Sequence, residues 1–363
     1  MTSSRPVLNI DLNIIANNYI YLTKLCLASE VAAVVKADCY GLGASRIVPV
    51  LQQQGCKHFF VANYEEGIAL REAHKDINIY VLNGLFADEV VILTEYNLIP
   101  VLHNYEQVRI WQEYATKLCK KLPCIVKIDV GMKRLGMSVT DFDKFLESAA
   151  DSHLEILYIM SHLTSSEEQD NPSNQIQLQK FEQLAQMLPN IARSLANSGA
   201  IFLGPQYHFD LVRPGAALYG ICFDSQNGIN CAVQLHAPII HMHELLPGES
   251  IGYNQIYVNN SNNSVLTATI PIGYADGFFR SLSNKAILYI DGIKVPIIGR
   301  ISMDMTAIDV SMIPRDKLFL GKQVEIIGPN SKISHLSGYA KTNEYEILTS
   351  LGQRFKRVYT TYL

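Results

Sequence analysis

The chain has 363 residues, of which 48% are hydrophobic and 18% charged, and its formal net charge is −4. This length suffices for two domains and a large buried core. The slight negative charge, without any run of Lys and Arg, argues against a nucleic-acid partner.

The N-terminal stretch MTSSRPVLNIDLN lacks the apolar core of a signal peptide, and no apolar run approaches membrane-spanning length. The seven cysteines are scattered and form no CxxC pair. An odd, unpatterned set predicts reduced thiols, rather than a disulfide framework or a metal site. We therefore expect a cytoplasmic protein with no membrane partner and no metal.

Between residue 31 and about residue 220, short apolar runs alternate with amphipathic segments of helical length. The runs are VAAVV (31–35), HFFVA (58–62), NIYVL (78–82), LIPVL (98–102), CIVKIDV (124–130) and LEILYIM (154–160). Candidate helices cover 64–74, 104–119 and 174–188. If IARSLANS and DLVRPGAALYG are counted as the last two strand regions, the segment contains about eight strand–helix units. This favours an α/β fold with a (β/α)8 TIM-type barrel over a doubly wound sheet, which would more often carry a GxGxxG turn.

After about residue 230 the pattern becomes β-rich. The segment NKAILYIDGIKVPIIG (284–299) contains two β-rich runs joined by Asp291-Gly292, a strong hairpin signal. SVLTATIPIGYADG and GKQVEIIG supply further short strands. We therefore expect a barrel over residues 8–230 and a C-terminal β-domain over 231–363, with residues 1–7 as a candidate addition to the second domain.

Lys36 ends the first apolar run and precedes a Gly-rich polar turn, ADCYGLG. A buried lysine costs free energy unless its charge is paired, lost or chemically used. A lone strand-end lysine usually extends to water. At the carboxyl end of a barrel strand, however, a lysine of lowered pKa is placed to form a Schiff base with pyridoxal phosphate or a carbonyl substrate.

A pyridoxal phosphate enzyme also needs a phosphate cradle and a partner for the pyridine nitrogen. Backbone N–H groups beside glycine, together with Ser and Tyr hydroxyls, are suitable phosphate donors. The candidates are Tyr40, the turn Asn197-Ser198-Gly199, and Gly215-Ala216. Taken alone, Asn-Ser-Gly is an ordinary turn.

Nine motifs occur in order along nearly the whole chain: AVVKADCYGLG, KIDVGMKRLG, SHLTSSE, LANSGA, LVRPGAALYG, SIGYNQIY, PIGYADGFFR, GRISMDM and RFKRVY. Together they resemble the motifs of the alanine racemase family. The resemblance implies a pyridoxal-phosphate-binding (β/α)8 barrel followed by a β-domain. It also implies interconversion of L- and D-alanine, which supplies D-alanine for peptidoglycan.

The resemblance assigns the two catalytic bases. Lys36 matches the lysine that holds the cofactor and serves the D-enantiomer, and Tyr253 matches the opposing base, which serves the L-enantiomer. Racemisation needs a base on each face of the α-carbon. Because free tyrosine has a pKa near 10, Tyr253 needs cationic or hydrogen-bonding neighbours to act near neutrality.

The cofactor contacts are also carried over by motif. Arg213 matches the arginine that faces the pyridine nitrogen, and because it can only donate, the ring nitrogen stays unprotonated. His162 matches the histidine packed against the ring. The remaining cofactor-binding residues are Tyr40, Ser198, Gly215, Ala216 and Tyr359, the last as a phosphate contact.

Three residues match the substrate side of the family's site: Arg134, Tyr274 and Met303. Lys127 matches a lysine that is often carbamylated, which would supply the negative charge that two neighbouring cations lack. The chain departs from the family at Val130 and Lys133, where Thr and Gly are usual, and at Ser194, where His is usual. That histidine belongs to a hydrogen-bond network between the arginine and the tyrosine.

Three alternative functions share part of this sequence pattern. A racemase of broader specificity would share these motifs. A barrel-type decarboxylase would typically face the pyridine nitrogen with a carboxylate, against which Arg213 argues, and a non-catalytic carrier would be a barrel alone. The resemblance further implies a homodimer with shared active sites, because Lys36 belongs to the barrel whereas Tyr253 and Met303 belong to the β-domain.

Overall fold

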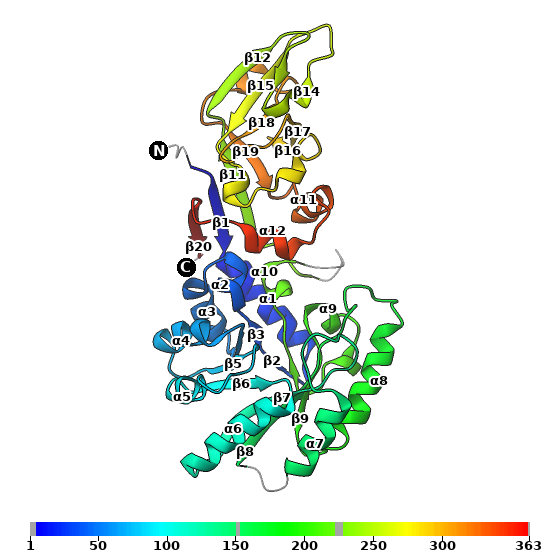
Figure 1. Cartoon of the computed structure of the whole chain (residues 1–363). Coiled ribbons are helices and arrows are strands. Elements are labelled where there is room, and N and C mark those ends of the chain that lie inside the picture. Colours follow the sequence, from blue (N-terminus) through cyan, green and yellow to red (C-terminus); the bar gives the residue numbers. More distant parts are fainter. Residues whose placement is uncertain (1–4, 150–152, 222–227, 362–363) are drawn as a thin grey trace. The chain divides into compact units, whose positions relative to one another are not determined.

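The computed structural model describes residues 5–149, 153–221 and 228–361 (Figure 1). The chain divides into two compact units, each described by itself below. The β unit comprises Met1–Asn13, Tyr40–Leu42 and Cys231–Leu363, and the barrel unit comprises Ile14–Cys39 and Gly43–Asn230.

The barrel unit is built on parallel strands that pair in chain order. These are β2 (Glu30–Val31), β3 (Ala33–Val34), β4 (His58–Val61), β5 (Asn78–Val81), β6 (Leu98–Leu102), β7 (Leu122–Lys127), β8 (Leu154–Met160), β9 (Ala192–Ser194) and β10 (Leu211–Val212). β3 to β9 form one sheet, and β10 pairs with β2. The bridge between Asn197 and Arg213 links the chain after β9 to the chain after β10, and β10 pairs with β2 just before β3, so the ring closes. The predicted eight-unit barrel is confirmed, with β2 and β3 as one strand region.

Helices connect these strands. They are α1 (Leu12–Leu25), α3 (Ala44–Gln53), α4 (Tyr64–Ala73), α5 (Val90–Glu95), α6 (Tyr105–Leu118), α7 (Val139–Ala149), α8 (Ser173–Ala185), α9 (Ser198–Ile201) and α10 (Ala216–Tyr219). Asn63 and Asn104 cap α4 and α6, because each side-chain oxygen accepts a hydrogen bond from the amide three residues later. The three predicted helices are confirmed within three residues at each end.

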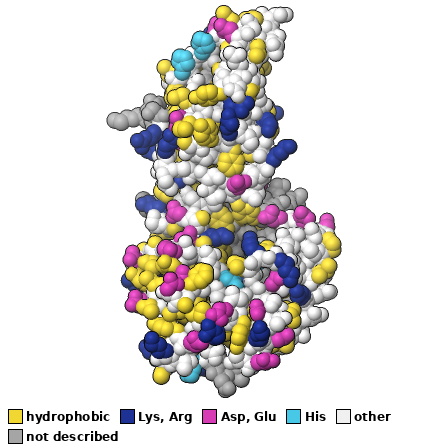
Figure 2. Space-filling model, viewed as in Figure 1, with side chains coloured by type: hydrophobic (Ala, Val, Ile, Leu, Met, Phe, Trp, Pro, Cys, Tyr) yellow, Lys and Arg dark blue, Asp and Glu magenta, His cyan; other side chains and the backbone are white. Residues whose placement is uncertain are grey.

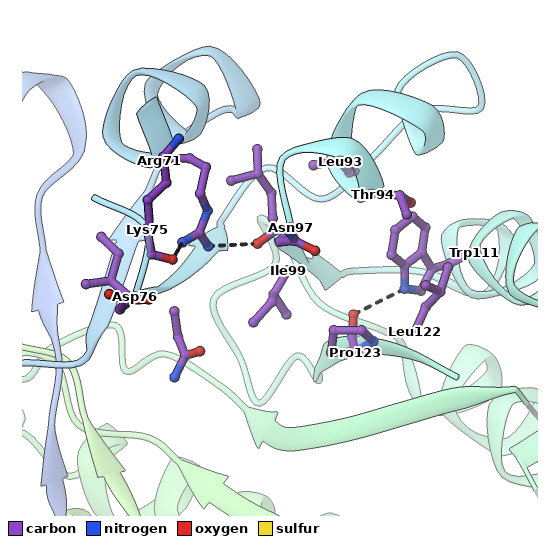
Figure 3. A pocket seen from close by; sticks show the side chains of 13 residues that line it. Arg71, Lys75, Asp76, Leu93, Thr94, Asn97, Ile99, Trp111, Leu122 and Pro123 are labelled. Atoms are coloured by element: carbon purple, nitrogen blue, oxygen red, sulfur yellow. Dashed lines mark hydrogen bonds between the residues drawn. The ribbon is translucent and has the colours of Figure 1, made fainter. Parts of the chain in front are cut away.

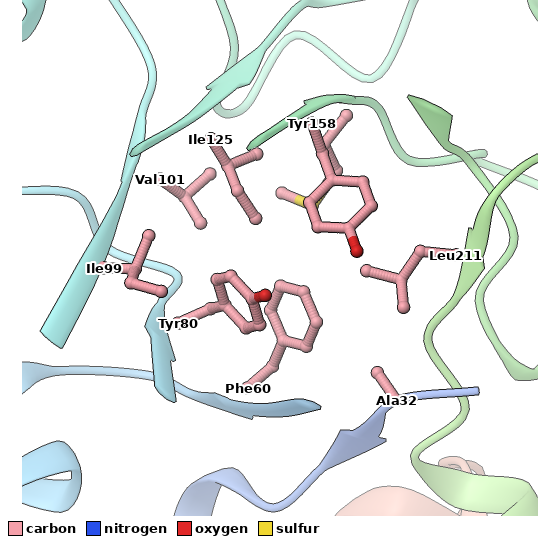
Figure 4. Close-up of a cluster of buried hydrophobic side chains, with 9 residues drawn as sticks. Ala32, Phe60, Tyr80, Ile99, Val101, Ile125, Tyr158 and Leu211 are labelled. Carbon is pink, nitrogen blue, oxygen red and sulfur yellow. The ribbon is translucent and has the colours of Figure 1, made fainter. Parts of the chain in front are cut away.

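Large side chains fill the interior of the barrel (Figure 4). The cluster contains Ala32, Phe60, Tyr80, Ile99, Val101, Ile125, Tyr158, Met160 and Leu211. The Phe60 and Tyr80 rings stack with centroids 4.6 Å apart. Both tyrosine hydroxyls have hydrogen-bond partners, since Tyr80 bonds His58 at 2.8 Å and Tyr158 donates to Glu30 at 3.2 Å. This packed interior makes the barrel a rigid support for the residues at its rim.

Arg71 holds together the ends of α4 and α5 beside a cavity of about 390 Å³ (Figure 3). Its guanidinium, in a side chain only 9% exposed, donates to four backbone carbonyl oxygens. The acceptors belong to His74, Lys75, Tyr96 and Asn97, at 2.7–3.3 Å. Trp111 lines the same cavity and donates its indole N–H to the Pro123 carbonyl at 3.2 Å. Arg71 thus satisfies carbonyl groups that the helix ends leave without partners.

The β unit is built on a nine-stranded sheet in the order β12-β15-β18-β17-β16-β19-β11-β1-β20. Its strands are β1 (Val7–Asp11), β11 (Val233–Pro238), β12 (His241–Leu245), β15 (Val265–Ile270), β16 (Ile287–Ile290), β17 (Ile293–Ile298), β18 (Thr306–Asp309), β19 (Gln323–Ile327) and β20 (Lys356–Thr360). β1 pairs antiparallel with β11 and parallel with β20. The predicted hairpin is confirmed, because β16 and β17 pair across Asp291-Gly292, both of which have positive φ.

Shorter elements complete the β unit: the hairpin of β13 (Ser250–Ile251) and β14 (Tyr257–Val258), the helices α11 (Ile333–Ala340) and α12 (Glu344–Ser350), and the turns η2 (Tyr253–Gln255) and η3 (Tyr274–Asp276).

Over the face seen in Figure 2, Lys and Arg side chains are interspersed with Asp and Glu. Within the described ranges no helix has the length and apolar character to cross a membrane. In the same ranges no three His, Cys, Asp or Glu side chains gather as metal ligands, and Cys222 lies outside them.

Replacing Arg71 by Met should lower the free energy of unfolding by about 3 kcal/mol, because four carbonyl groups at the ends of α4 and α5 lose a charged donor. Trp111 is the only tryptophan of the chain, so its fluorescence in a urea titration follows the barrel unit specifically. The control is Arg109→Met, which removes an exposed arginine paired with Glu106 and Glu113 on α6. The control should cost less than about 1 kcal/mol. Equal losses in both variants would contradict the role given to Arg71.

Candidate active site at the barrel rim

The barrel brings cationic and polar side chains to one rim. Lys36 follows β3, Lys127 ends β7, His162 lies two residues after β8, Ser198 lies four residues after β9, and Arg213 follows β10 directly. The carboxyl ends of parallel strands meet at the same end of a barrel, where active sites of this architecture lie. The predicted barrel residues of the site are thus brought to one place.

The segment after Lys36 has an unusual backbone. α2 (Lys36–Gly41) is a single turn in which Ala37, Asp38, Cys39 and Tyr40 have φ between 52° and 58°. Left-handed backbone costs about 1–2 kcal/mol for each residue with a side chain, so consecutive residues of this kind persist only where their surroundings hold them. The Asp38 carboxylate holds part of the turn by accepting from the Ala44 amide at 2.7 Å.

The surroundings of Lys36 favour its neutral form. Burial lowers the pKa of Lys36, the charge of Arg134 lowers it further, and Glu66 opposes both. A neutral amine is the form that attacks a carbonyl carbon. The rim therefore lowers the pKa of Lys36, as formation of a Schiff base requires.

Arg213 is 4% exposed, and neutral oxygens hold it. Its guanidinium donates to the Ser194 hydroxyl at 2.5 Å, to the Ser161 carbonyl at 2.7 Å and to the Leu195 carbonyl at 3.3 Å. Ser194 in turn donates to the Leu211 carbonyl at 2.6 Å. Burial lowers the pKa of Arg213 to about 9, so the guanidinium keeps its proton at neutral pH. Ser194 thus serves as an acceptor for Arg213 where the family usually has histidine.

The turn that begins α9 packs against the turn that begins α10. The Ser198 hydroxyl accepts from the amides of Gly215 and Ala217 at 2.9 and 3.2 Å. Because it accepts twice, its own proton is available to a further acceptor. A side chain at Gly199 would lie 2.7 Å from the Ser166 carbonyl, so only glycine permits this approach. Ser198, Gly215 and the buried Ala216 therefore come together, as the cradle hypothesis requires.

Lys127 is buried among other cations. Burial lowers its pKa to about 8, and the charges of Arg213 and Arg134 lower it in the same direction. Lys133 pairs instead with Asp129, its Nζ 3.0 Å from a carboxylate oxygen, and its own backbone amide donates to the same carboxylate at 3.0 Å. The extra lysine of this chain therefore has a partner within its own loop.

His162 is uncharged in these surroundings. Burial and then the charge of Arg213 hold its pKa well below the ordinary value. Its Nε2 lies 3.4 Å from the side-chain nitrogen of Asn197, which caps α9. A neutral imidazole can pack against an aromatic ring without adding to the positive charge of the rim.

Three of the remaining predicted site residues belong to the β unit, whereas Arg134 belongs to the barrel unit. Tyr253, Tyr274 and Met303 are 66%, 44% and 53% exposed. Tyr274 and Met303 lie on adjoining loops, because the Tyr274 amide donates to the Ser302 carbonyl at 3.1 Å. A side chain at Gly273 would lie 2.4 Å from the Met303 carbonyl, so glycine is needed for this contact.

Tyr40 and Tyr359 both belong to the β unit. The Tyr359 hydroxyl donates to the Leu42 carbonyl at 2.9 Å, and the Tyr40 ring lies 6.1 Å from that of Tyr345. Arg357 donates to the Gly41 carbonyl at 3.2 Å. Side chains near the C-terminus thus support the residues that follow the left-handed turn.

Several residues that shape the site were not predicted from the sequence. Glu66 bonds the amides of Ala37 and Ala62, although its position three residues after Asn63 suggests only a helix cap. Arg354 binds Asp276 through Nε and Nη2 at 2.6 and 2.8 Å, and Asp276 accepts from the Gly273 amide at 3.0 Å. Arg354 and Asp276 are 78 positions apart in the sequence, so no local sequence pattern predicts this ion pair.

Two family models match the chain. The model "Alanine racemase, N-terminal domain" matches residues 10–222, and "Alanine racemase, C-terminal domain" matches residues 232–359. An alanine racemase of Rickettsia canadensis is 47% identical over 355 residues, covering 97% of this chain and 98% of that protein. One from Rickettsia typhi is 40% identical over 397 residues, with 97% and 98% covered.

Solved structures agree with these matches. The crystal structure of alanine racemase from Bartonella henselae with covalently bound pyridoxal phosphate has a TM-score of 0.95 at 37% identity, covering 99% of this chain and all of that one. The biosynthetic alanine racemase of Pseudomonas aeruginosa has a TM-score of 0.91 at 29% identity, with 99% and 100% covered. Both domains of the chain are therefore matched together.

Proposed function

The chain belongs to the alanine racemase family, and we propose that it interconverts L-alanine and D-alanine with pyridoxal 5′-phosphate. The observation that carries the proposal is that two cationic residues lie at the same rim. They are Lys36, whose pKa is lowered, and Arg213, whose guanidinium is bound by neutral oxygens. A decarboxylase of this architecture would face the pyridine nitrogen with a carboxylate. A guanidinium in that position favours racemisation.

The donor set of the rim fits a phosphorylated, anionic cofactor. Lys36 and Arg213 are cationic side chains that both act electrostatically on Lys127, and Ser198 has a hydroxyl proton to donate. Lys36 would hold the cofactor, and Arg213 would donate to its pyridine nitrogen. His162 would pack on the ring, while Tyr40, Ser198, Gly215, Ala216 and Tyr359 would surround the phosphate. When bound, pyridoxal phosphate supplies an electron sink that acidifies the α-proton of the amino acid.

Two bases would exchange the α-proton. Lys36 would take the proton from D-alanine, and Tyr253 would take it from the opposite face, in L-alanine. Arg134 and the backbone amide of Met303 would bind the carboxylate, and Tyr274 would line the approach to the site. Because Tyr253 is 66% exposed in its own chain, the groups that make it a base must come from outside its immediate surroundings.

Lys127 is suited to carbamylation. A pKa of about 8 leaves about a tenth of the amine neutral at pH 7. The neutral nitrogen would bond to the carbon of carbon dioxide and release one proton, which converts the cation into an anion. That anion would face Arg134, whose charge acts on Lys127 in the structure.

The proposed assembly is a cytoplasmic homodimer with active sites built from both chains, whose product supplies D-alanine for peptidoglycan. Tyr253, Tyr274 and Met303 are large apolar or aromatic side chains that one chain leaves exposed. Exposed groups of this kind mark interaction surfaces. In a two-fold dimer each contact occurs twice, so both sites would be completed alike.

Incubation with L-alanine and pyridoxal phosphate should produce D-alanine, detected by chiral chromatography, until the two enantiomers are equal. Borohydride reduction followed by peptide mapping should place the cofactor on Lys36, and Lys36→Ala should lose both the label and activity. Serine and glutamate serve as control substrates for breadth. Carbon dioxide release, or a cofactor label on a different lysine, would contradict the assignment.

Tyr253→Phe should make exchange of the α-proton asymmetric. In heavy water, deuterium incorporation into L-alanine should fall by about a hundredfold or more, because a positioned base contributes about 10²–10⁴-fold. Incorporation into D-alanine should fall much less, because Lys36 remains. Tyr257→Phe, four residues away, is the control. Equal losses from both enantiomers in Tyr253→Phe would refute the two-base scheme.

Mixing the inactive variants Lys36→Ala and Tyr253→Ala tests the shared site. Random exchange of subunits makes half the dimers mixed, and each mixed dimer would contain one intact site. About a quarter of wild-type activity should therefore return. Mass labelling confirms that exchange has occurred. No return of activity after confirmed exchange would show that each chain supplies both bases to its own site.

A further inference from the structure

The strained turn after Lys36 is tied to a neighbouring strand through one carboxylate. Glu66 Oε1 accepts from the Ala37 amide at 2.8 Å, and Glu66 Oε2 accepts from the Ala62 amide at 2.8 Å. Ala37 is the first residue of the left-handed run, and Ala62 directly follows β4. β3 and β4 are paired neighbours, with Val34 opposite Phe60. Glu66 therefore connects the ends of two adjacent strands at the point where Lys36 leaves the sheet.

The helix that carries Glu66 fixes the position of this carboxylate. Asn63 caps α4 and accepts from the Glu66 amide at 3.1 Å. Glu66 lies in the first turn of α4, where the helix dipole stabilises a negative charge. In the usual capping pattern, a glutamate at this place bonds the amide of the cap residue itself. Here it reaches one residue further back, to Ala62, and across to Ala37.

The Glu66 carboxylate also acts electrostatically on Lys36, one of the cations at the rim. Lys36 acts electrostatically on Lys127 and His162, and Arg134 acts on Lys36. Among these charged groups Glu66 is the negative one that raises the pKa of Lys36. A glutamate that served α4 only as a cap would need neither this charge nor the contact with Ala37.

We propose that Glu66 is a positioning residue for Lys36: its carboxylate clamps the left-handed turn to the end of β4 and places a negative charge among the cations of the rim. The inference rests on the proposed role of Lys36 in holding the cofactor. It assigns to α4, an outer helix of the barrel, a direct part in preparing the lysine.

The first test measures the amine of Lys36 in the full chain with cofactor removed. The variant Glu66→Gln keeps the shape of the side chain but not its charge. Labelling of Lys36 by trinitrobenzenesulfonate, followed by peptide mapping, gives the pH at which half of the amine reacts at its full rate. This midpoint should move to lower pH by about half a unit or more, because a carboxylate that favours the charged amine is lost.

Glu65→Gln is the matched control. It removes the same charge from the neighbouring residue of α4, whose side chain is exposed. Its Lys36 midpoint should equal that of the wild type. If Glu66→Gln also leaves the midpoint unchanged, the electrostatic part of the proposal is overturned.

The second test separates the clamp from the charge. Glu66→Asp keeps the charge but is one methylene too short to reach both amides. Hydrogen exchange over residues 36–43 and at Ala62 should accelerate by about tenfold or more in Glu66→Asp and in Glu66→Gln, and not in Glu65→Gln. If exchange stays at the wild-type rate in both Glu66 variants, the clamp is overturned.

Neither readout depends on catalysis. The rate at which pyridoxal phosphate becomes covalently bound, followed by its visible absorption, links the two tests to the proposed function. This rate should fall in both Glu66 variants relative to Glu65→Gln. A shifted midpoint and a loosened turn without any covalent cofactor, even in the wild type, would reject the proposed function and leave the positioning of Lys36 by Glu66 in place.

Discussion

The site depends on the accumulation of positive charge at one end of a closed barrel. Lys36, Lys127 and Arg213 extend from different strands toward a rim where burial removes the screening that water provides elsewhere. In such surroundings like charges repel strongly, and each lysine gains by losing its proton. The pKa of both lysines is accordingly lowered. The chemistry proposed for the rim, a nucleophilic amine beside an anion site, follows from this one constraint.

The carboxylates near the rim only partly offset its positive charge, because in both lysines the effects that lower the pKa outweigh those of Glu66 and Asp129. Arg213 is bonded to carbonyl and hydroxyl oxygens, which satisfy its donors without cancelling its charge. Asp129, two residues after the end of β7, is occupied by Lys133 and by backbone amides. The positive charge of the rim thus remains available to an anionic ligand. Packing of the barrel interior makes this arrangement rigid, because the strand ends cannot separate without disturbing the cluster around Tyr80.

The elements of the barrel were largely predictable because its strands are short, apolar and covered on both faces. β6 is the predicted run LIPVL, residue for residue, and its five residues are all buried. Helix ends were predicted less accurately. The 174–188 segment keeps its helical composition to Met187, but α8 ends at Ala185, where the chain turns toward β9. Composition alone does not show where a helix stops packing against the sheet.

Local patterns in the sequence were enough to predict the alternation of strands and helices in the barrel, the hairpin at Asp291-Gly292, and Lys36 at the end of a strand. These follow from periodicity and from the rule that parallel strands in a barrel share one carboxyl edge. The polar partners, in contrast, depend on the folded barrel: Ser194 for Arg213, Asp129 for Lys133, and Glu66 for the turn at Ala37. A hydrogen bond or an ion pair depends on angstrom-scale distances between segments far apart in the chain. Such distances arise when the barrel closes, and no local pattern of residues contains them.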